Sequence, residues 1–165
     1  LLPFLVLTPI AIPEILMGVS LLIFFVLLNV TLGMTSIILA HVAFCIGFVA
    51  IVVRARMQGM DNSLVEAARD LGATPWQAFR LVTLPQIMPG ILAGGLMAFT
   101  LSIDDFVITF FTAGVGSSTL PLQIYSMIKI AVTPEVNAIS TLLMLLTLAL
   151  IVAASKLAPG AFKAN

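Results

Sequence analysis

The sequence predicts an all-α protein, a polytopic bundle of membrane-spanning helices. Of its 165 residues, 61% are hydrophobic and 8% are charged, whereas an average soluble domain has about 45–50% and about 25%. A spanning helix needs about 20 mostly apolar residues. Four visible stretches meet that requirement, namely residues 1–28, 35–53, 90–112 and 138–155.

The first stretch, residues 1–28, is longer than one crossing requires. At about 1.5 Å per residue it would reach about 42 Å, whereas the hydrocarbon core is about 30 Å thick. We expect it to tilt, break or begin outside the bilayer, with Pro9 and Pro13 as places for a break. It has no initiator Met, charged leader or small-residue cleavage site, so we expect that earlier sequence is missing.

The basic residues predict the orientation of the spans. Two spans separate residue 53 from residue 155, so six of the seven basic residues fall on one side, which is typical of the cytoplasmic side. We therefore expect segments 54–89 and 156–165 to be cytoplasmic, and segments 29–34 and 113–137 to be external. The six are Arg54, Arg56, Arg69, Arg80, Lys156 and Lys163, and Lys129 lies alone on the external side.

Charge and motifs exclude several classes of function. The net charge is zero, so nothing draws the chain to nucleic acid. One cysteine, Cys45, and one histidine, His41, make an internal disulfide or a self-contained metal site improbable, and we interpret both as ordinary helix residues. The chain has no P-loop and no Ser/His/Asp constellation, so we expect neither an ATPase nor a hydrolase.

The segment between the second and third spans carries the signals of two short helices. Ser63 and Glu66 fit a capping box, and Gly72 can supply the left-handed residue that ends the first helix. Residues 74–77 (Thr-Pro-Trp-Gln) repeat the start signal, and we expect Leu84-Pro85 to stop the second helix. Each helix would have about eight residues.

Helices this short are marginal in water, so their apolar stripes must pack against something. One alternative is that both stripes pack against the ends of their own spans. The other is that one stripe, with exposed charged residues, docks into another protein. The stripes are Leu64, Ala67, Ala68 and Leu71 on the first helix and Trp76, Phe79 and Val82 on the second, and the charges are Arg69, Asp70 and Arg80.

These residues carry a resemblance to a known family. The series Glu66-Ala67-Ala68, Gly72-Ala73, Phe79, Leu84-Pro85 and Pro89 resembles the EAA loop of ABC importer permeases. In that family the loop docks in a cleft of the cytoplasmic ATPase. The resemblance therefore implies ATPase coupling through the motif, with the final Leu-Pro fixing the return to the bilayer. The residues so assigned are Glu66, Ala67, Ala68, Gly72, Ala73, Leu84 and Pro85.

The resemblance extends over nearly the whole chain to the permeases of bacterial spermidine/putrescine importers, through residues 102–105, 120–129 and 133–138. Such permeases usually have six spans, so two would precede this chain. The resemblance implies import of polyamine across the bacterial inner membrane by alternating access. It also implies an ATPase dimer, a sister permease and a periplasmic or surface substrate-binding protein as partners. No cofactor belongs to this chain, because ATP and Mg²⁺ would bind the ATPase.

Three carboxylates fall within apolar stretches, where an ionised group costs at least about 2.5–3.5 kcal/mol and is a functional candidate. We favour Asp105 for the substrate pathway, because Ser102, Asp105, Thr109 and Thr112 recur as one stripe along an expected continuous helix over residues 90–112. Asp104 is rotated by about 100° and could equally contact a neighbouring span. Glu14 follows Pro13 and has a packing alternative.

A cationic cargo would need aromatic faces beside these carboxylates. Phe106, Phe110, Phe111 and Tyr125 are available, although packing is the commoner role of such residues. Residues 120–129 have the composition of a short interfacial helix, which would close an outer gate, touch a binding protein or remain passive. Small residues at four-residue spacing predict helix packing, either within the bundle or against a sister permease. They are Gly90, Gly94 and Ala98, and Ala43 and Gly47.

Three rival functions stay open at this point. The nearest is the same type of importer with a sugar, anion or metal as its cargo. The second is a stand-alone proton-coupled carrier in which Glu14, Asp104 and Asp105 form a proton relay. The third is a membrane scaffold that only recruits a cytoplasmic partner.

Overall fold

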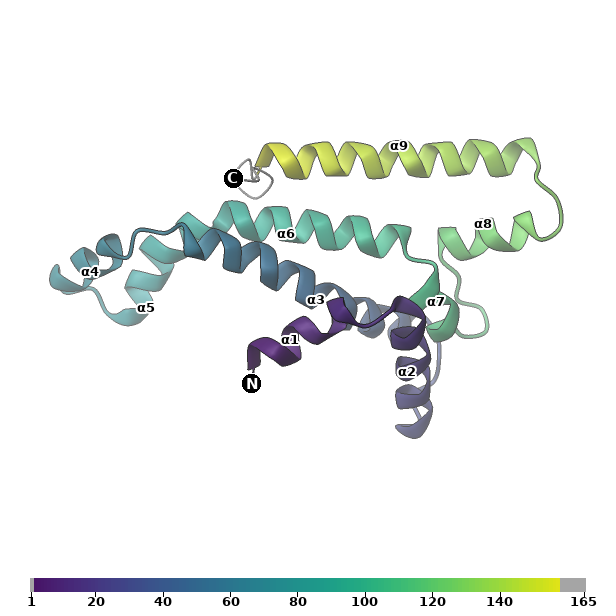
Figure 1. The fold of residues 1–165 in the computed structure, drawn as a ribbon, viewed down its shortest axis with the longest axis horizontal. Helices are drawn as coiled ribbons and strands as arrows, with labels where there is room; N and C mark the ends of the chain where they lie inside the picture. The colour runs from purple at the N-terminus through teal and green to yellow at the C-terminus, as the bar shows by residue number, and fades with distance from the viewer. Residues whose placement is uncertain (1, 158–165) are drawn as a thin grey trace.

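The computed structural model describes residues 2–157, and this part of the chain is helical without any strand (Figure 1), which confirms the all-α prediction. Residues 158–165, including Lys163, lie outside the described residues. The elements in order are α1 (Leu2–Ala11), α2 (Glu14–Leu27), α3 (Met34–Gln58), α4 (Ser63–Asp70), α5 (Pro75–Ala78), η1 (Phe79–Thr83), α6 (Leu84–Asp104), α7 (Val107–Thr112), α8 (Leu120–Ile128) and α9 (Pro134–Leu157).

The first apolar stretch is two helices, so the expected break within residues 1–28 is confirmed, and neither helix alone has the length of a span. The chain breaks at Pro13, one of the two expected places, whereas Pro9 lies inside α1. Figure 1 shows α2 turning away from α1 and from the long helices. At 14 residues, α2 is about 21 Å long. Within residues 2–157, three helical segments are long and apolar enough to cross a membrane, namely Met34–Gln58, Pro75–Asp104 and Pro134–Ala153.

Helices α3 and α6 pack closely because α6 presents glycines to α3. A Cβ atom on Gly90 would lie 2.8 Å from Cβ of Arg56, and one on Gly94 would lie 3.2 Å from Cγ1 of Val49. The Arg56 side chain also donates from Nε to the carbonyl oxygen of Gln86 at 3.0 Å. The small residues of α6 therefore pack within this chain, which answers the question that the sequence left open for Gly90 and Gly94.

The segment between α3 and α6 forms a helical hairpin, residues 63–83, at one end of the molecule (Figure 1). Gly72 joins its helices with φ +89°, as expected of a left-handed turn. The capping box of Thr74 and Gln77 is also confirmed, because the Thr74 amide donates to Gln77 Oε1 at 2.8 Å and the Gln77 amide donates to Thr74 Oγ1 at 3.3 Å.

The expected Ser63–Glu66 capping box is wrong. Asn62 precedes the helix, and Ser63 is its first residue. The Ser63 amide donates to Oδ1 of Asp61 at 2.9 Å, so this carboxylate takes the place expected for the Glu66 side chain, and the Glu66 amide donates to the Asn62 carbonyl oxygen at 3.1 Å. Hydrogen bonds from Ser63 hold the pKa of Asp61 below its ordinary value.

Leu84-Pro85 does not stop the second helix, contrary to expectation, and the helix runs on from Pro75 to Asp104. A proline ring normally clashes with the carbonyl four residues earlier. Here the preceding turn, η1, is a π-helix in which the Leu84 amide donates to Phe79, five residues back. The wider π turn makes room for the ring, so Pro85 stays in the first turn of α6.

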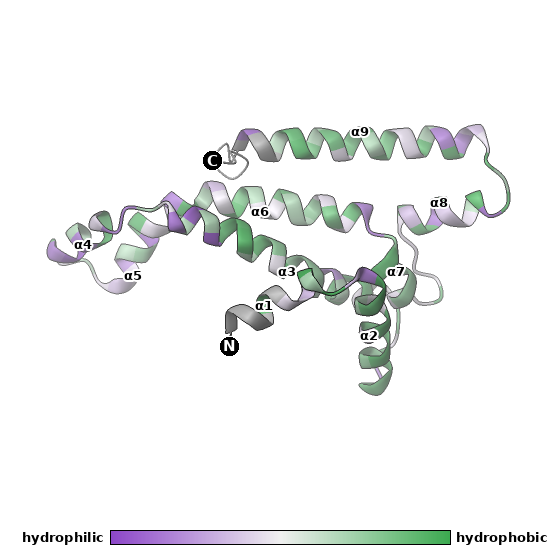
Figure 2. Ribbon diagram, viewed as in Figure 1, coloured by the Kyte–Doolittle hydropathy of each residue, from purple (hydrophilic) through white to green (hydrophobic). Residues whose placement is uncertain are grey.

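The expected continuous helix over residues 90–112 is also wrong. Helix α6 ends at Asp104, Asp105 is extended with φ −65° and ψ 126°, and α7 begins at Val107. The short helix expected over residues 120–129 is confirmed as α8, and α9 begins at Pro134. Helix α9 lies beside α6 (Figure 1), and Figure 2 shows it largely hydrophobic along its length.

The basic residues lie at the two ends of the molecule as the predicted sidedness requires. Helix α9 runs back from α8 toward the hairpin end of the molecule (Figure 1), so Lys156 lies toward the same end as Arg54. Lys129, at the end of α8, lies at the opposite end. Hydrophilic residues gather at the hairpin end in Figure 2. This arrangement is consistent with the sidedness that the sequence predicts.

Adding a methyl group at Gly90 tests the α3–α6 contact. We expect Gly90→Ala to destabilise the purified protein by about 1–3 kcal/mol, because its Cβ would overlap Cβ of Arg56. Gly95→Ala is the matched control, since a Cβ there meets nothing within 4 Å and should stabilise the helix by about 0.5–1 kcal/mol. Denaturant unfolding in detergent measures both, and equal effects would contradict the packing argument.

Candidate functional site

The break between α6 and α7 is built around the carboxylate of Asp105. Its Oδ1 accepts from the Ile108 amide at 3.2 Å, and its Oδ2 accepts from the Thr109 amide at 2.8 Å and the Thr109 hydroxyl at 2.9 Å. A carboxylate that accepts from the first free amides of a helix caps that helix. Asp105 therefore ends α6 and begins α7 with one side chain.

His41, on α3, completes this buried cluster. Its Nε2 lies 3.2 Å from Asp105 Oδ2 and 2.9 Å from Thr109 Oγ1, and its Nδ1 lies 2.7 Å from Ser102 Oγ. The Thr109 hydroxyl gives its hydrogen to Asp105, so we assign the ring hydrogen to Nε2, which donates to both oxygens. One imidazole thus contacts α6, the break and α7. We call His41, Ser102, Asp105 and Thr109 the His41 cluster.

The surroundings of the His41 cluster keep it inside the protein. Thr109 and Thr112 are fully buried on α7, and His41 and Asp105 are nearly so. The Ser36 hydroxyl of α3 donates to the Thr112 carbonyl at 2.7 Å, which fastens the far end of α7. Ile108 packs into a core with apolar residues of α2 and α3, namely Met17, Phe25, Ala40, Phe44 and Cys45. Among residues 2–157 no three His, Cys, Asp or Glu side chains gather for a metal ion.

Asp104 lies on the other side of the break, in an open cavity of about 480 Å³ between α6, α8 and α9, the Asp104 cavity. The Phe106 and Tyr125 rings line it with centroids 4.6 Å apart, and the ammonium of Lys129 lies 4.7 Å from the Tyr125 centroid. The Thr147 hydroxyl, on α9, is buried in its wall without a hydrogen-bond partner. The cavity thus offers a carboxylate, aromatic faces and an unpaired hydroxyl.

A second cavity, of about 500 Å³, lies beside the first and shares Pro121 and Leu143 with it. His41 and Ser102 line it, so the His41 cluster forms part of its wall. Thr119 contributes a buried hydroxyl that also has no partner. Both cavities therefore border the broken helix, the first at Asp104 and Phe106 and the second at Ser102.

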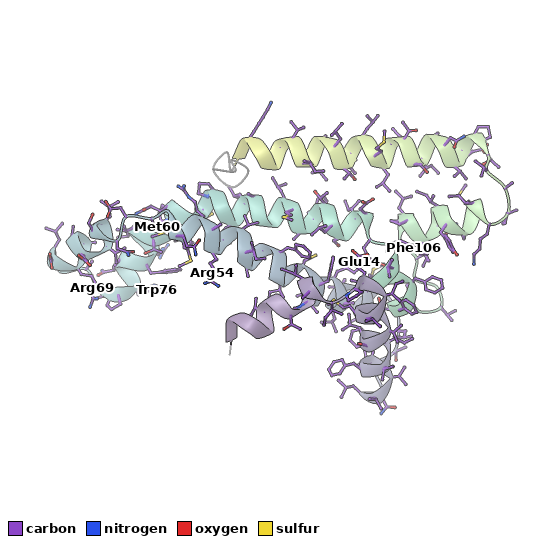
Figure 3. All side chains as sticks on the ribbon, in the orientation of Figure 1. Glu14, Arg54, Met60, Arg69, Trp76 and Phe106 are labelled. Atoms are coloured by element: carbon purple, nitrogen blue, oxygen red, sulfur yellow. The ribbon has the colours of Figure 1, made fainter. Side chains whose placement is uncertain are left out.

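The structure brings most of the predicted pathway residues to this break. Asp104, Phe106 and Tyr125 share the Asp104 cavity, whereas Asp105, Ser102 and Thr109 belong to the His41 cluster. Glu14 is exposed at the start of α2 and lines neither cavity. Figure 3 labels Glu14 and Phe106.

Sequence reasoning missed His41 and Thr147. His41 was interpreted as an ordinary helix residue, although an ionisable group inside an apolar stretch is a functional candidate whatever its charge. The sequence analysis applied that criterion to the carboxylates alone, and extending it to histidine would have found His41. Thr147 gave no comparable signal, because a threonine in a spanning helix ordinarily bonds its own backbone.

The hairpin exposes apolar side chains at the end of the molecule. Leu71 is 90% exposed, Leu81 71% and Trp76 68%, and the Trp76 ring stacks on Phe79 at 5.5 Å (Figure 3). A groove of about 440 Å³ runs between its helices, lined in part by Ala68, Gly72 and Ala73. This exposure favours docking over packing against the ends of the spans.

The long apolar helices are those of a membrane protein. Residues 1–160 match the family described as "Binding-protein-dependent transport system inner membrane component", and the chain belongs to that family. It is accordingly a multi-pass protein of the inner membrane, and the family is one of transport permeases rather than enzymes.

Curated relatives come from several bacteria. The chain is 43% identical over 153 residues to the spermidine/putrescine transport system permease protein PotC of Escherichia coli (strain K12), covering 93% of this chain and 58% of that protein. It is 46% identical over 147 residues to the putrescine transport system permease protein PotI of the same strain, covering 86% and 52%. PotC of Haemophilus influenzae is 44% identical over 140 residues, covering 85% and 54%. This chain therefore spans little more than half the length of these relatives.

Removing the Asp105 side chain tests its role at the break. We expect Asp105→Ala to destabilise the protein by about 1–3 kcal/mol, because it leaves buried donors of α7 and His41 unpaired. Asp104→Ala, one residue away and exposed, should change stability by less than about 0.5 kcal/mol. Denaturant unfolding in detergent separates the two, and similar losses for both variants would refute the different roles.

Proposed function

We propose that the protein is the membrane-spanning permease subunit of an ATP-driven ABC importer that moves polyamine, spermidine or putrescine, across the bacterial inner membrane. The observation that carries this proposal is the hairpin of residues 63–83, which holds the EAA motif and projects from the long helices with its apolar side chains exposed. Its natural partner is the cytoplasmic ATPase dimer, which binds the ATP and Mg²⁺. This chain needs no cofactor of its own.

The hairpin is suited to coupling by its construction. Its first helix has eight residues, too few for stability in water without a packing partner. The left-handed turn at Gly72 sets the two helices around a groove that Ala68 and Ala73 line. Glu66 and Ala67, with Gly72, form the surface offered to the ATPase, and Leu84 and Pro85 carry its displacement into α6. Small residues there let a partner's backbone approach closely.

The Asp104 cavity suits an ammonium group. A carboxylate forms a charge-assisted hydrogen bond with it, the Phe106 and Tyr125 rings offer cation–π contact, and the unpaired Thr147 hydroxyl can accept. Lys129 already holds an ammonium over the Tyr125 ring. The names of the relatives from Escherichia coli and Haemophilus influenzae state spermidine or putrescine transport, which supports a polyamine as cargo here.

The two adjacent carboxylates then have different parts in transport. Asp104 contacts the cargo, because it is exposed to the cavity and has no hydrogen bond among the described residues. Asp105, with Ser102 and Thr109, forms the wall behind it. Glu14 lies on the pathway only where α2 meets a sister permease, since it is exposed away from both cavities.

The mechanism is alternating access. ATP-driven closure of the ATPase dimer displaces the hairpin, and the spans rock about the cavities at the α6–α7 break. A sister permease completes the pathway. Two further spans in the full-length protein complete a six-span subunit, in which the broken stretch of α1 and α2 counts as one crossing. A substrate-binding protein delivers the cargo at the α8 end, opposite the hairpin.

Two alternatives remain distinguishable by experiment. The same importer could carry a sugar, anion or metal, which would leave the ammonium-binding chemistry of the Asp104 cavity unused. A proton-coupled carrier is favoured by one observation, the buried contact of His41 with Asp105, but it leaves the exposed hairpin without a role. ATP-independent uptake into vesicles that hold the whole complex would favour the carrier.

The ATPase contact is tested by a charged substitution at Leu71. We expect Leu71→Arg to weaken association with the ATPase at least tenfold in co-purification and titration, because it removes an apolar contact worth about 1.5–3 kcal/mol. Glu66→Ala should leave the complex uncoupled or dissociated. Ile130→Arg is the matched control, because Ile130 is 89% exposed at the opposite end of the molecule. Equal loss with both arginine variants would refute docking through the hairpin.

The cargo contact is tested by Asp104→Asn. In vesicles holding the full-length protein and its partners, we expect the KM for spermidine and putrescine uptake to rise about 10- to 100-fold, because a charge-assisted hydrogen bond worth about 1.5–3 kcal/mol is lost. ATPase binding should be unchanged. Glu135→Gln, exposed at the same end outside the cavity, is the control and should leave KM unaltered. ATP-driven uptake of neither amine by the unmodified complex would reject the polyamine.

A further inference from the structure

We infer that His41 is a positioning residue: from α3 it holds the broken turn between α6 and α7, and thereby keeps Asp104 and Phe106 at the Asp104 cavity. The transport part of this inference rests on the proposed function. Its structural part does not, because it concerns contacts within this chain.

The first argument is the number of elements that one side chain joins. The imidazole contacts Ser102 on α6, Asp105 in the break and Thr109 on α7, at 2.7, 3.2 and 2.9 Å. Both ring nitrogens are therefore engaged, each with a different side of the break. An amide side chain carries its donor and its acceptor on one terminal group, whereas an apolar side chain supplies neither.

The second argument is the weakness of α7 without these contacts. Helix α7 has six residues, far fewer than an isolated helix needs. Its order depends on the Asp105 cap, the buried Ile108, and two polar contacts with α3, through His41 and Ser36. Of the two polar contacts with α3, the one through His41 is nearer to Asp104 and Phe106, the residues that line the Asp104 cavity.

The third argument is adjacency along the chain. Asp104 and Phe106 flank Asp105, so any rotation of the Asp105 backbone moves both of them. Asp105 is extended where its neighbours on either side are helical. Without His41 to hold the Asp105 carboxylate, the turn gains freedom at the position that decides where the cavity-facing side chains point.

The first test uses a cysteine in place of the fully buried Thr112 as a reporter, in the full-length protein with other cysteines, including Cys45, replaced by alanine. We expect a maleimide to label this cysteine slowly with His41 present. His41→Leu should raise the rate more than tenfold, because α7 loses one of its two polar contacts with α3 and the Asp105 cap loses a donor. His41→Gln keeps a donor for Asp105 and Thr109, so it should restore most of the protection.

The control is Ile87→Ala, a truncation of a buried side chain on α6 that lines neither cavity. If His41 only adds to general stability, this substitution will raise the labelling rate as much as His41→Leu does. That result, or equal rates in the His41→Leu variant and the unmodified chain, would overturn the inference. The labelling needs neither ATP nor cargo, so its outcome is independent of the proposed function.

The second test uses uptake by the assembled importer. A displaced Asp104 binds cargo poorly, so His41→Leu should raise the KM for spermidine at least fivefold. His41→Gln should return the KM toward the unmodified value, and Ile87→Ala should leave it within twofold. An unmodified complex without polyamine uptake would reject the proposed function, while the labelling result would still decide the positioning role. An unchanged KM in His41→Leu would overturn the cargo-facing part of the inference.

Discussion

A carboxylate among apolar helices has to find hydrogen-bond donors inside the protein, and the way Asp105 does so determines the centre of this structure. Four donors converge on it, from Ile108, Thr109 and His41. Satisfying a buried charge in this way avoids a penalty of several kcal/mol. The backbone amides that it takes are those of a new helix, so satisfying Asp105 is the same event as interrupting the spanning helix.

The interruption separates two neighbouring carboxylates that the sequence presents as a pair. Asp105 faces inward and is used by its own chain, whereas Asp104 is left for whatever enters the cavity beside α8 and α9. Irregular backbone at this depth is tolerated only where it is buried in protein or lines a cavity. At this break Asp105 is buried in protein and Asp104 lines a cavity, so each residue meets one of these two conditions.

The predictable part of the fold follows local rules, and the unpredictable part follows long-range contacts. Length and apolar composition predicted three of the spans, and glycine and threonine chemistry predicted the hairpin turn and the α5 cap. The stripe of Ser102, Asp105 and Thr109 indicated residues that do lie in one cluster. It assumed a continuous helix, however, because His41 lies 64 positions before Asp105 and no local pattern links the two.

Local competition explains the smaller errors. The Ser63–Glu66 capping box does not form because the Asp61 carboxylate accepts from the Ser63 amide and the Asn62 carbonyl oxygen accepts from the Glu66 amide. Pro85 did not stop its helix because a π turn accommodated the ring, a solution that proline rules based on α-helical geometry do not anticipate. The residues of the candidate site were largely named from the sequence, but their division between a cavity and a buried cluster required the tertiary fold.

Two helices of unequal stiffness connect the hairpin to the membrane interior. Helix α3 runs from Met34 to Gln58 without a proline or a π turn, whereas the route through α6 begins with η1 and contains Pro85 and Pro89. A force applied at the hairpin is thus shared by the stiffer helix α3 and the more easily bent route through η1 and α6. Helix α3 begins near Ser36 and His41, the two residues that contact α7, so a displacement along α3 reaches α7 directly. The route through α6 bends instead at η1 and its prolines.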